Sequence, residues 1–142
     1  MTYPDIEMLI DGEWTGSATT EPVINPATGE EIGRVPHATT AQLDEALAAT
    51  KKGFAVWSAA SPWARAQVME KAAPSCAFVA WNFPGTNVIR KVAHALGAGC
   101  SLIVKPSEET PATGMEIVRA FHDAGVPKGA LQLVFGVPDN VS

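Results

Sequence analysis

Two short groups of polar residues each follow an apolar run, and both contain side chains that can take part in chemistry. Asn82 comes just after the run 76–80, and Lys105-Pro106-Ser107-Glu108 comes directly after Ser101-Leu102-Ile103-Val104. In an open parallel sheet, ligands bind beyond the carboxyl ends of the strands. If both runs are strands, the two groups lie at one end of the sheet and form a candidate ligand site.

The second group contains a carboxylate that suits a ribose. Glu108 stands just past its strand, where it can accept hydrogen bonds from ribose hydroxyls, and Lys105 can donate to the same sugar. The negative charge repels a 2′-phosphate, so it favours NAD over NADP. The alternative is a solvated cluster of Lys105, Glu108 and Glu109 that binds nothing, and position alone does not decide between the two.

The first group offers a neutral amide. The side chain of Asn82 can donate to a developing oxyanion, or it can cap the helix that follows. The adjacent Trp81 has an ordinary alternative as a core residue. The three-glycine loop that binds a dinucleotide's pyrophosphate is absent at this turn, where Trp81-Asn82-Phe83-Pro84-Gly85 stands instead. A standard pyrophosphate site is therefore not predicted here.

The elements that must position these residues follow from the pattern between 74 and 142. Continuous apolar runs predict strands buried on both faces, and they lie at 76–80, 101–104 and 131–135. Helical spacing predicts two helices between them, from Gly85 to Gly97 and from Thr110 to Gly125. Strand, helix, strand, helix, strand is half of a doubly wound, Rossmann-like parallel sheet, so the predicted fold class is α/β.

The inward faces of these two helices are predicted from the spacing of their apolar residues. They are Val88, Ile89, Val92 and Leu96 in the first helix, and Met115, Val118 and Phe121 in the second.

The residues before this unit predict β-hairpins. Asp11-Gly12 is a strong turn pair between the extended runs 8–10 and 13–14. A second pair of extended runs is predicted at 22–24 and 31–35.

Two helices are predicted after these hairpins. Thr39 and Gln42 have the spacing of a capping box at the start of the first. Ser61 caps the second, Val68, Met69 and Ala72 form its inward face, and Pro74 ends it. The inward face of the first is predicted as Leu43, Leu47, Phe54 and Trp57.

Composition narrows the class of protein. The chain has 142 residues, 46% hydrophobic and 18% charged, with a formal net charge of −5. An acidic chain without a basic stripe is a poor nucleic-acid binder. No apolar stretch reaches the ~20 residues of a membrane span, and no signal peptide is predicted, so we expect a cytoplasmic protein.

The cysteines and histidines suggest no chemistry of their own. The two cysteines, Cys76 and Cys100, are expected to be buried, reduced thiols. The three histidines, His37, His94 and His122, lack metal-ligand spacing, so structural roles are expected and no metal site is predicted.

Several short motifs, each present once, follow one another in a set order along nearly the whole chain. They are Ile10-Asp11-Gly12-Glu13-Trp14, Ile24-Asn25-Pro26-Ala27-Thr28-Gly29-Glu30, Phe54 to Trp57 with Arg65, Trp81-Asn82-Phe83-Pro84, Ala98-Gly99-Cys100-Ser101, Lys105-Pro106-Ser107-Glu108-Glu109-Thr110-Pro111 and Ala124-Gly125-Val126-Pro127. In this order and spacing, the chain resembles the NAD(P)-dependent aldehyde dehydrogenase superfamily, and most closely its succinate-semialdehyde dehydrogenase type.

The resemblance implies a role for each site residue. Asn82 corresponds to the amide that steadies the thiohemiacetal oxygen after a cysteine attacks the aldehyde. Lys105 and Glu108 correspond to the pair that holds the adenosine ribose, with Ser107 beside them. Further cofactor-cleft residues are Phe78, Val79 and Trp81. The implied cofactor is NAD, with NADP less favoured, and the implied substrate is an aldehyde that is oxidised to an acid.

The chain also departs from the family. Family members are several times longer, and the nucleophilic cysteine, the general-base glutamate and the oligomerisation strands have no counterpart here. The chain divides into a hairpin and helical segment at 1–73 and a partial NAD-binding unit at 74–142, with a long family segment missing at the junction.

Three expectations follow from these departures. An internally deleted, C-terminally truncated dehydrogenase should be inactive alone. Its alternative functions are a non-catalytic nucleotide-binding remnant or an interaction fragment. A three-stranded sheet with both edges open should also tend to pair with another chain.

Overall fold

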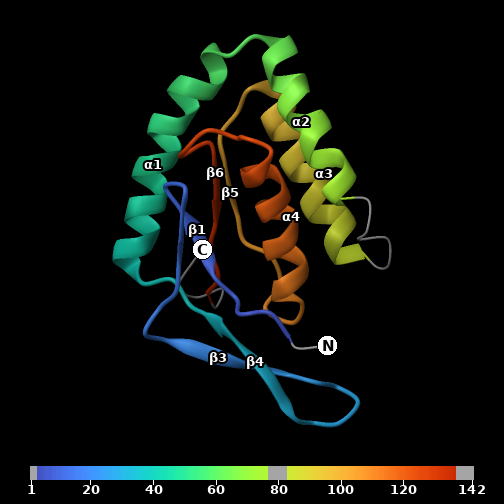
Figure 1. Ribbon diagram of the computed structural model, residues 1–142. Helices are drawn as coiled ribbons and strands as arrows, with labels where there is room; N and C mark the ends of the chain where they lie inside the picture. Colours follow the sequence, from blue (N-terminus) through green and yellow to red (C-terminus); the bar gives the residue numbers. More distant parts are fainter. Residues whose placement is uncertain (1–2, 77–82, 137–142) are drawn as a thin grey trace.

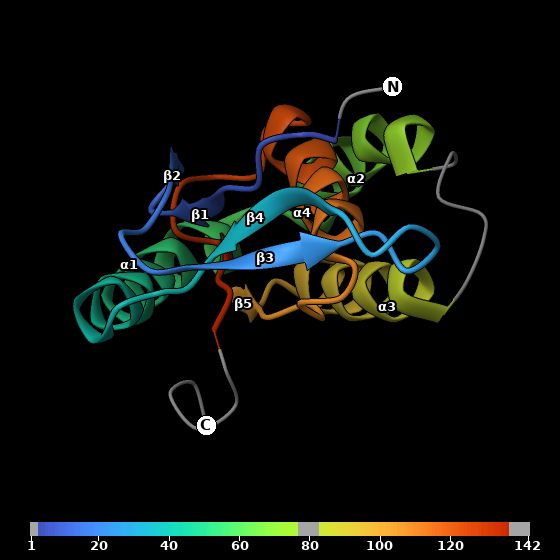
Figure 2. The same ribbon diagram turned by 90° about the horizontal axis from the view of Figure 1, so that it is seen from below.

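The computed structural model describes residues 3–76 and 83–136, and it has a layered α/β architecture (Figure 1). Helix α1 lies on one side of a four-stranded sheet, α3 and α4 lie on the other, and α2 covers α3 and α4 from outside (Figure 1). A separate two-stranded ribbon, β3–β4, lies across one end of the layers (Figure 2). In chain order the elements are β1 (Met8–Ile10), β2 (Glu13–Thr15), β3 (Thr20–Ile24), β4 (Glu31–Pro36), α1 (Thr40–Ala59), α2 (Pro62–Cys76), α3 (Phe83–Ala98), β5 (Leu102–Val104), α4 (Pro111–Asp123) and β6 (Leu131–Leu133).

The main sheet is mixed, with the strand order β2-β1-β6-β5. Strands β5 and β6 are parallel, as predicted, with Leu102 opposite Leu131. Strand β1 pairs antiparallel with β6, with Leu9 opposite Leu133. The expectation of a sheet with both edges open is therefore wrong at β6, because the N-terminal hairpin covers that edge.

The strand predicted at 76–80 does not begin where it was expected. Cys76 is the last residue of α2, so the prediction of a strand that begins there is wrong at this residue. The rest of the run, 77–80, lies outside the described residues. Pro74 does not end α2 as predicted. The helix continues to Cys76, although proline lacks the backbone N–H that would bond to the carbonyl four residues earlier.

The N-terminal hairpin forms as predicted. Its turn residues Asp11 and Gly12 have φ values of 46° and 77°, the left-handed conformation at both centres that a tight type I′ hairpin requires. The pairing sets Met8 opposite Thr15. The buried amide of Gln132 on β6 fixes the hairpin further, since its Oε1 accepts a hydrogen bond from the Asp11 backbone N–H at 2.8 Å. The second predicted pair of strands forms β3–β4.

Helix α1 begins with the predicted capping box. Thr39 Oγ1 accepts from the backbone N–H of Gln42 at 3.2 Å, and Gln42 Oε1 accepts from the backbone N–H of Thr39 at 3.0 Å. These two bonds satisfy amide groups that the first helical turn leaves without partners.

The predicted inward face of α1 is largely wrong. Leu47 and Phe54 are 52% and 48% exposed, although Trp57 is buried and Leu43 is half-buried against the core. The face that packs carries the small residues Ala46, Ala49 and Gly53, followed by Trp57. A Cβ atom on Gly53 would lie 2.0 Å from the carbonyl carbon of Gly129, so α1 meets the loop before β6 backbone to backbone. Only a small-residue face permits that approach.

The remaining helices pack on their predicted faces. Ala72 of α2 is buried and its predicted neighbours Val68 and Met69 are half-buried, and Ser61 caps this helix by accepting from the backbone N–H of Ala64 at 3.1 Å. In α3, Val92 and Leu96 are fully buried, with Val88 and Ile89 half-buried, and in α4 Met115, Val118 and Phe121 are buried. Thr110 stands at the N-cap of α4 but makes no side-chain capping bond. In the described parts of the chain, no helix combines the length and apolar character needed to cross a membrane.

Candidate functional site

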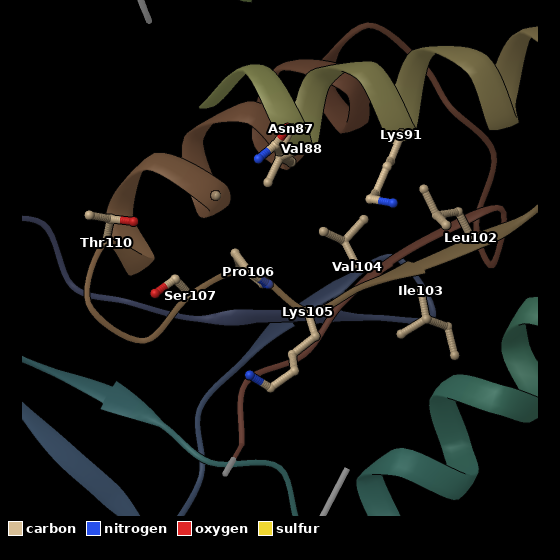
Figure 3. Close-up of a pocket in the computed structure, with 11 residues that line it drawn as sticks. Asn87, Val88, Lys91, Leu102, Ile103, Val104, Lys105, Pro106, Ser107 and Thr110 are labelled. Atoms are coloured by element: carbon tan, nitrogen blue, oxygen red, sulfur yellow. The ribbon is translucent and has the colours of Figure 1, made fainter. Parts of the chain in front are cut away.

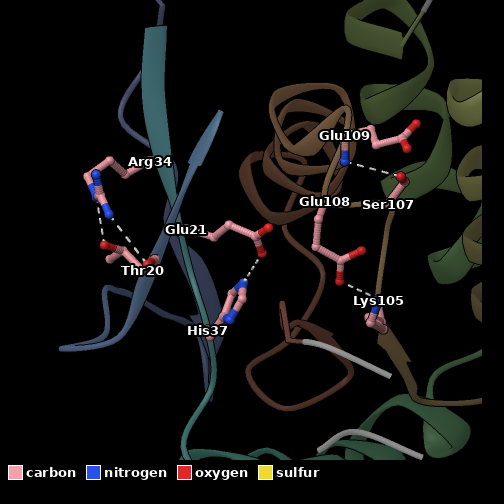
Figure 4. Close-up of polar contacts among 8 residues, drawn as sticks. All are labelled: Thr20, Glu21, Arg34, His37, Lys105, Ser107, Glu108 and Glu109. Atoms are coloured by element: carbon pink, nitrogen blue, oxygen red, sulfur yellow. Dashed lines mark hydrogen bonds and ion pairs between the residues drawn. The ribbon is translucent and has the colours of Figure 1, made fainter. Parts of the chain in front are cut away.

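The predicted ribose-binding residues lie where the chain leaves the sheet after β5. Lys105 Nζ and the Glu108 carboxylate form an ion pair across this turn (Figure 4). The two side chains are 28% and 25% exposed, so each keeps an accessible surface while most of it is covered. The structure therefore brings Lys105 and Glu108 together at the carboxyl end of a parallel strand.

The surroundings of Glu108 hold its carboxyl group in the charged form. Burial alone would raise its pKa. The hydrogen bond and positive charge of Lys105, together with hydrogen bonds from the backbone amides of Glu108 and Gly136, outweigh burial and lower the pKa below its usual value. Glu108 is therefore ionised at neutral pH.

Gly136 is a contributor that is not among the residues predicted from sequence. It follows the last predicted strand, just as Lys105 follows β5, so the carboxyl ends of both parallel strands converge on one carboxylate. The signal available in the sequence was a glycine directly after an apolar run, a position where the backbone can approach a ligand closely.

Ser107 and Glu109 have local roles in the turn. Ser107 Oγ accepts a hydrogen bond from the backbone N–H of Glu109 at 3.2 Å (Figure 4). Among the ion pairs of the described residues, Lys105 pairs with Glu108 and not with Glu109, whose side chain is exposed. The alternative of a three-residue charge cluster is therefore not what forms. Lys105 pairs with Glu108, and Glu109 is not part of the pair.

The β3–β4 side of the site carries a second polar pair. His37 Nε2 lies 3.1 Å from Glu21 Oε2, and the His37 side chain is only 14% exposed (Figure 4). This contact joins β3 to the chain that follows β4, which agrees with the structural role predicted for this histidine.

A cavity of about 540 Å³ runs along the outer edge of β5 (Figure 3). Leu102 and Val104 point to one side of the strand, towards Lys91 of α3, while Ile103 and Lys105 point to the other. Residues from both sides line the cavity, so it follows the strand edge. In the described part of the chain, no strand pairs with this edge. The cavity therefore lies beside a strand edge that is open among the described residues.

The other predicted site residues lie outside the described residues. They are Phe78, Val79, Trp81 and Asn82. The roles predicted for them stay predictions. Of the two cysteines, Cys100 is a free thiol and exposed, so its predicted burial is wrong.

The donor set at the end of β5 fits the sugar of a nucleotide. An ionised carboxylate accepts two hydroxyl hydrogen bonds, and a neighbouring ammonium donates to the same group. A carboxylate at the carboxyl end of a parallel strand is how dinucleotide-binding α/β proteins hold a ribose. The position of this carboxylate is thus similar to that in dinucleotide-binding α/β proteins.

Comparison with known proteins gives the family. The model of the aldehyde dehydrogenase family matches this chain in two pieces, residues 14–77 and 74–142. The chain belongs to the aldehyde dehydrogenase family.

Individual relatives agree with this assignment. Glutarate-semialdehyde dehydrogenase of Pseudomonas putida is 27% identical over 200 residues, covering 92% of this chain and 42% of the relative. D-glyceraldehyde dehydrogenase (NADP(+)) of Picrophilus torridus is 52% identical over 60 residues, covering 42% of this chain and 12% of the relative.

A solved structure agrees as well. Aldehyde dehydrogenase C of Pseudomonas syringae, a C291A mutant in complex with NAD⁺ and octanal, superposes with a TM-score of 0.85 at 25% identity. The superposition covers 99% of this chain and 43% of that one. The chain thus spans about two fifths of the length of the relatives that it matches along most of its length.

Proposed function

We propose that the chain binds the adenosine half of NAD(P) through Lys105 and Glu108, as part of a fold built for the oxidation of aldehydes to acids. The observation that carries this proposal is the ion pair at the carboxyl end of β5, in a chain of the aldehyde dehydrogenase family. The residues present in this chain support cofactor binding without catalysis.

The chemistry divides between the cofactor and the chain. When bound, the nicotinamide accepts a hydride from the substrate. Glu108 holds the ribose by accepting from its hydroxyl groups, and Lys105 both donates to the sugar and keeps Glu108 ionised. In the resemblance, Asn82 donates to the oxygen of the attacked aldehyde.

The charge of Glu108 supports NAD as the preferred cofactor. A 2′-phosphate would be placed against the carboxylate that accepts from the 2′-hydroxyl, and like charges at that distance repel. Lys105 offsets part of this repulsion, because it lies beside the same oxygens. We therefore expect tighter binding of NAD⁺ than of NADP⁺, with NADP⁺ still able to bind. Titrations of this chain with each cofactor measure the ratio of the two affinities.

The proposed substrate class is a semialdehyde, with succinate semialdehyde as the specific candidate. The support is the resemblance of the motifs at 81–84 and 105–111 to the succinate-semialdehyde type, together with the similarity to a glutarate-semialdehyde dehydrogenase. Both compounds carry an aldehyde at one end and a carboxylate at the other.

The chain alone is proposed to be inactive. Cys100 stands before β5, whereas Lys105 and Glu108 stand after it. In the resemblance, the position of Cys100 does not match that of the nucleophilic cysteine. The two overlapping pieces of the family match support a missing internal segment at residues 74–77.

Nuclear magnetic resonance tests which half of the cofactor is bound. We expect AMP to shift the amide signals of Lys105, Glu108 and Gly136, and nicotinamide mononucleotide to leave them unchanged. The matched control is Glu109→Gln, which should respond as the unchanged chain does. Shifts by AMP elsewhere in the fold, or none at these amides, would overturn the proposed site.

A further inference from the structure

Strand β5 uses one of its two edges for pairing. In the part of the chain that the structure describes, its partner is β6. The backbone N–H of Leu102 donates to the carbonyl of Ala130 at 2.9 Å. The carbonyl of Val104 accepts from the N–H of Val134 at 3.0 Å. Alternate residues of a strand bond to the same neighbour, so the N–H and carbonyl of Ile103 point to the other, open edge. An open edge of this kind is a template for another strand.

The side chains of β5 are only partly covered as well. Leu102 and Ile103 are half-buried, whereas all three residues of β6 are buried. The cavity of about 540 Å³ follows this edge, with Val88 of α3 in its wall (Figure 3). We call this surface the β5 groove and define it by Val88, Lys91 and residues 102–104. It combines unpaired backbone groups with apolar side chains.

The charge in the β5 groove has one sign. The described residues that line the cavity include Lys91 and Lys105 and no aspartate or glutamate, in a chain of net charge −5. Lys105 is paired with Glu108, but none of the ion pairs of the described residues involves Lys91. Leu102 and Val104 point towards Lys91 (Figure 3). A ligand with a carboxylate on this face of the strand would pair with the ammonium group.

We propose that the β5 groove binds an extended segment of a partner protein, which adds a strand to the edge of β5 and places an acidic side chain against Lys91. In strand addition, main-chain hydrogen bonds give affinity and alternate side chains give selectivity. Residues of the segment opposite 102 and 104 face α3, and the residue between them faces the other way. Because β5 has three residues, few hydrogen bonds form, and we expect a dissociation constant in the high-micromolar to millimolar range.

Two other occupants fit the β5 groove less well. A second copy of this chain, paired antiparallel about Ile103 on a two-fold axis, brings its own Lys91 to the same face, so like charges meet. A fatty acid can offer its carboxylate to Lys91. However, its hydrocarbon chain would cover the N–H and carbonyl of Ile103 without bonding to them, which costs free energy.

The test is a titration of the 142-residue chain, followed by the backbone amide signals of residues 102–104. The probe is the acetylated and amidated pentapeptide Thr-Glu-Val-Val-Thr, whose glutamate and second valine lie on one face of a strand. The control probe is the same peptide N-methylated at both valines, which keeps the side chains and removes the donors for the Ile103 carbonyl. We expect saturable shifts with the first peptide and binding about fivefold weaker or more with the second. Equal binding of the two peptides, or no saturable shift at millimolar peptide, overturns the proposal.

Charge reversal tests the acidic contact. Lys91→Glu should bind the peptide Thr-Lys-Val-Val-Thr more tightly than Thr-Glu-Val-Val-Thr, which reverses the preference of the unchanged chain. Lys71→Glu, on α2 and outside the cavity, should keep the original preference. Both positions are exposed, so both variants should fold, which circular dichroism melting verifies. A preference that Lys91→Glu leaves unchanged overturns the contact.

Two further titrations identify the other occupants. Decanoate is the probe for a fatty acid, and the chain itself, at increasing concentration, is the probe for a second copy. Neither should shift the amide signals of residues 102–104. If decanoate shifts them where the pentapeptide does not, or if the chain alone shifts them as it is concentrated, the proposed partner segment is wrong.

Discussion

The indole Nε1 of Trp57 donates a hydrogen bond to the backbone carbonyl of Leu96 at 2.9 Å, and both residues are buried. Trp57 belongs to α1 and Leu96 to α3, which lie on either side of the 74–77 junction between the two matched family segments. The carbonyl is in the last turn of α3, where it also accepts from the backbone N–H of Gly99 at 3.0 Å. The bond from Trp57 ties the two segments into one core.

Removing this bond should destabilise the whole fold. Trp57→Phe keeps an aromatic ring but loses the donor and part of the buried volume, so we expect the free energy of unfolding to fall by about 1–2 kcal/mol. Urea denaturation measures it. The control is Trp63→Phe, because Trp63 is 71% exposed. A control variant as destabilised as Trp57→Phe would contradict this account of the core.

The backbone approach between α1 and the loop before β6 predicts opposite effects for one substitution at two helical glycines. Gly53→Ala drives a methyl group into the Gly129 backbone and should cost about 2–4 kcal/mol of stability. Gly97→Ala meets only Met69 Sδ at 3.7 Å, and should add about 0.5–1 kcal/mol through helix propensity. Thermal melting of both variants checks the signs, and a tolerated Gly53→Ala would show that the packing is looser than described.

Substitution of the two N-cap threonines should also have unequal effects on stability. Thr39→Ala removes a complete capping box and should cost about 1 kcal/mol. Thr110→Ala removes no capping bond and should change stability by less than ~0.5 kcal/mol. Denaturant titrations of the two variants give the comparison, and equal losses would mean that the cap geometry at Thr39 is not used in solution.

These elements show which features local sequence predicts. The hairpin turn at Asp11-Gly12, the capping box at Thr39 and the inward face of α4 each depend on residues close together in the chain, and all three are confirmed. Features set by distant residues were not predictable in this way. The α1 stripe of Leu47 and Phe54 is as periodic as the one that packs, and only the loop at Gly129 selects between them.

In the candidate site, too, local sequence predicts some features, and residues distant in the chain determine others. The turn after β5 places Lys105 and Glu108 together, which their spacing and the strand pattern predicted. The pairing of β1 with β6 and the Gly136 amide on Glu108 join residues more than twenty positions apart, and no local pattern encodes such contacts. The remaining predicted residues, at 78, 79, 81 and 82, lie outside the described chain.

Glu108 also gives a prediction about pH. Its pKa is lower in the folded chain than the ordinary value, so its ionised form stabilises the fold above the ordinary pKa. This contribution is lost as the pH falls through the lowered value. The unchanged chain should therefore exceed Glu108→Gln in stability at pH 7 by no more than about 1 kcal/mol. The two should converge in acid, because a protonated glutamate resembles glutamine.

Urea denaturation at neutral and acidic pH measures this difference. Glu109→Gln is the matched control, since Glu109 makes no ion pair among the described residues. A gap between the unchanged chain and Glu108→Gln that persists unchanged in acid would contradict the assigned ion pair.

The most direct test of the proposed ribose contact is a calorimetric titration of the 142-residue chain with NAD⁺, alongside Glu108→Gln and Glu109→Gln. A carboxylate that accepts from the ribose should, when neutralised, weaken binding about tenfold or more. We expect saturable binding by the unchanged chain and by Glu109→Gln, and this weakening for Glu108→Gln alone. Equal binding by all three folded proteins, or none by the unchanged one, would contradict a cofactor site at Lys105 and Glu108.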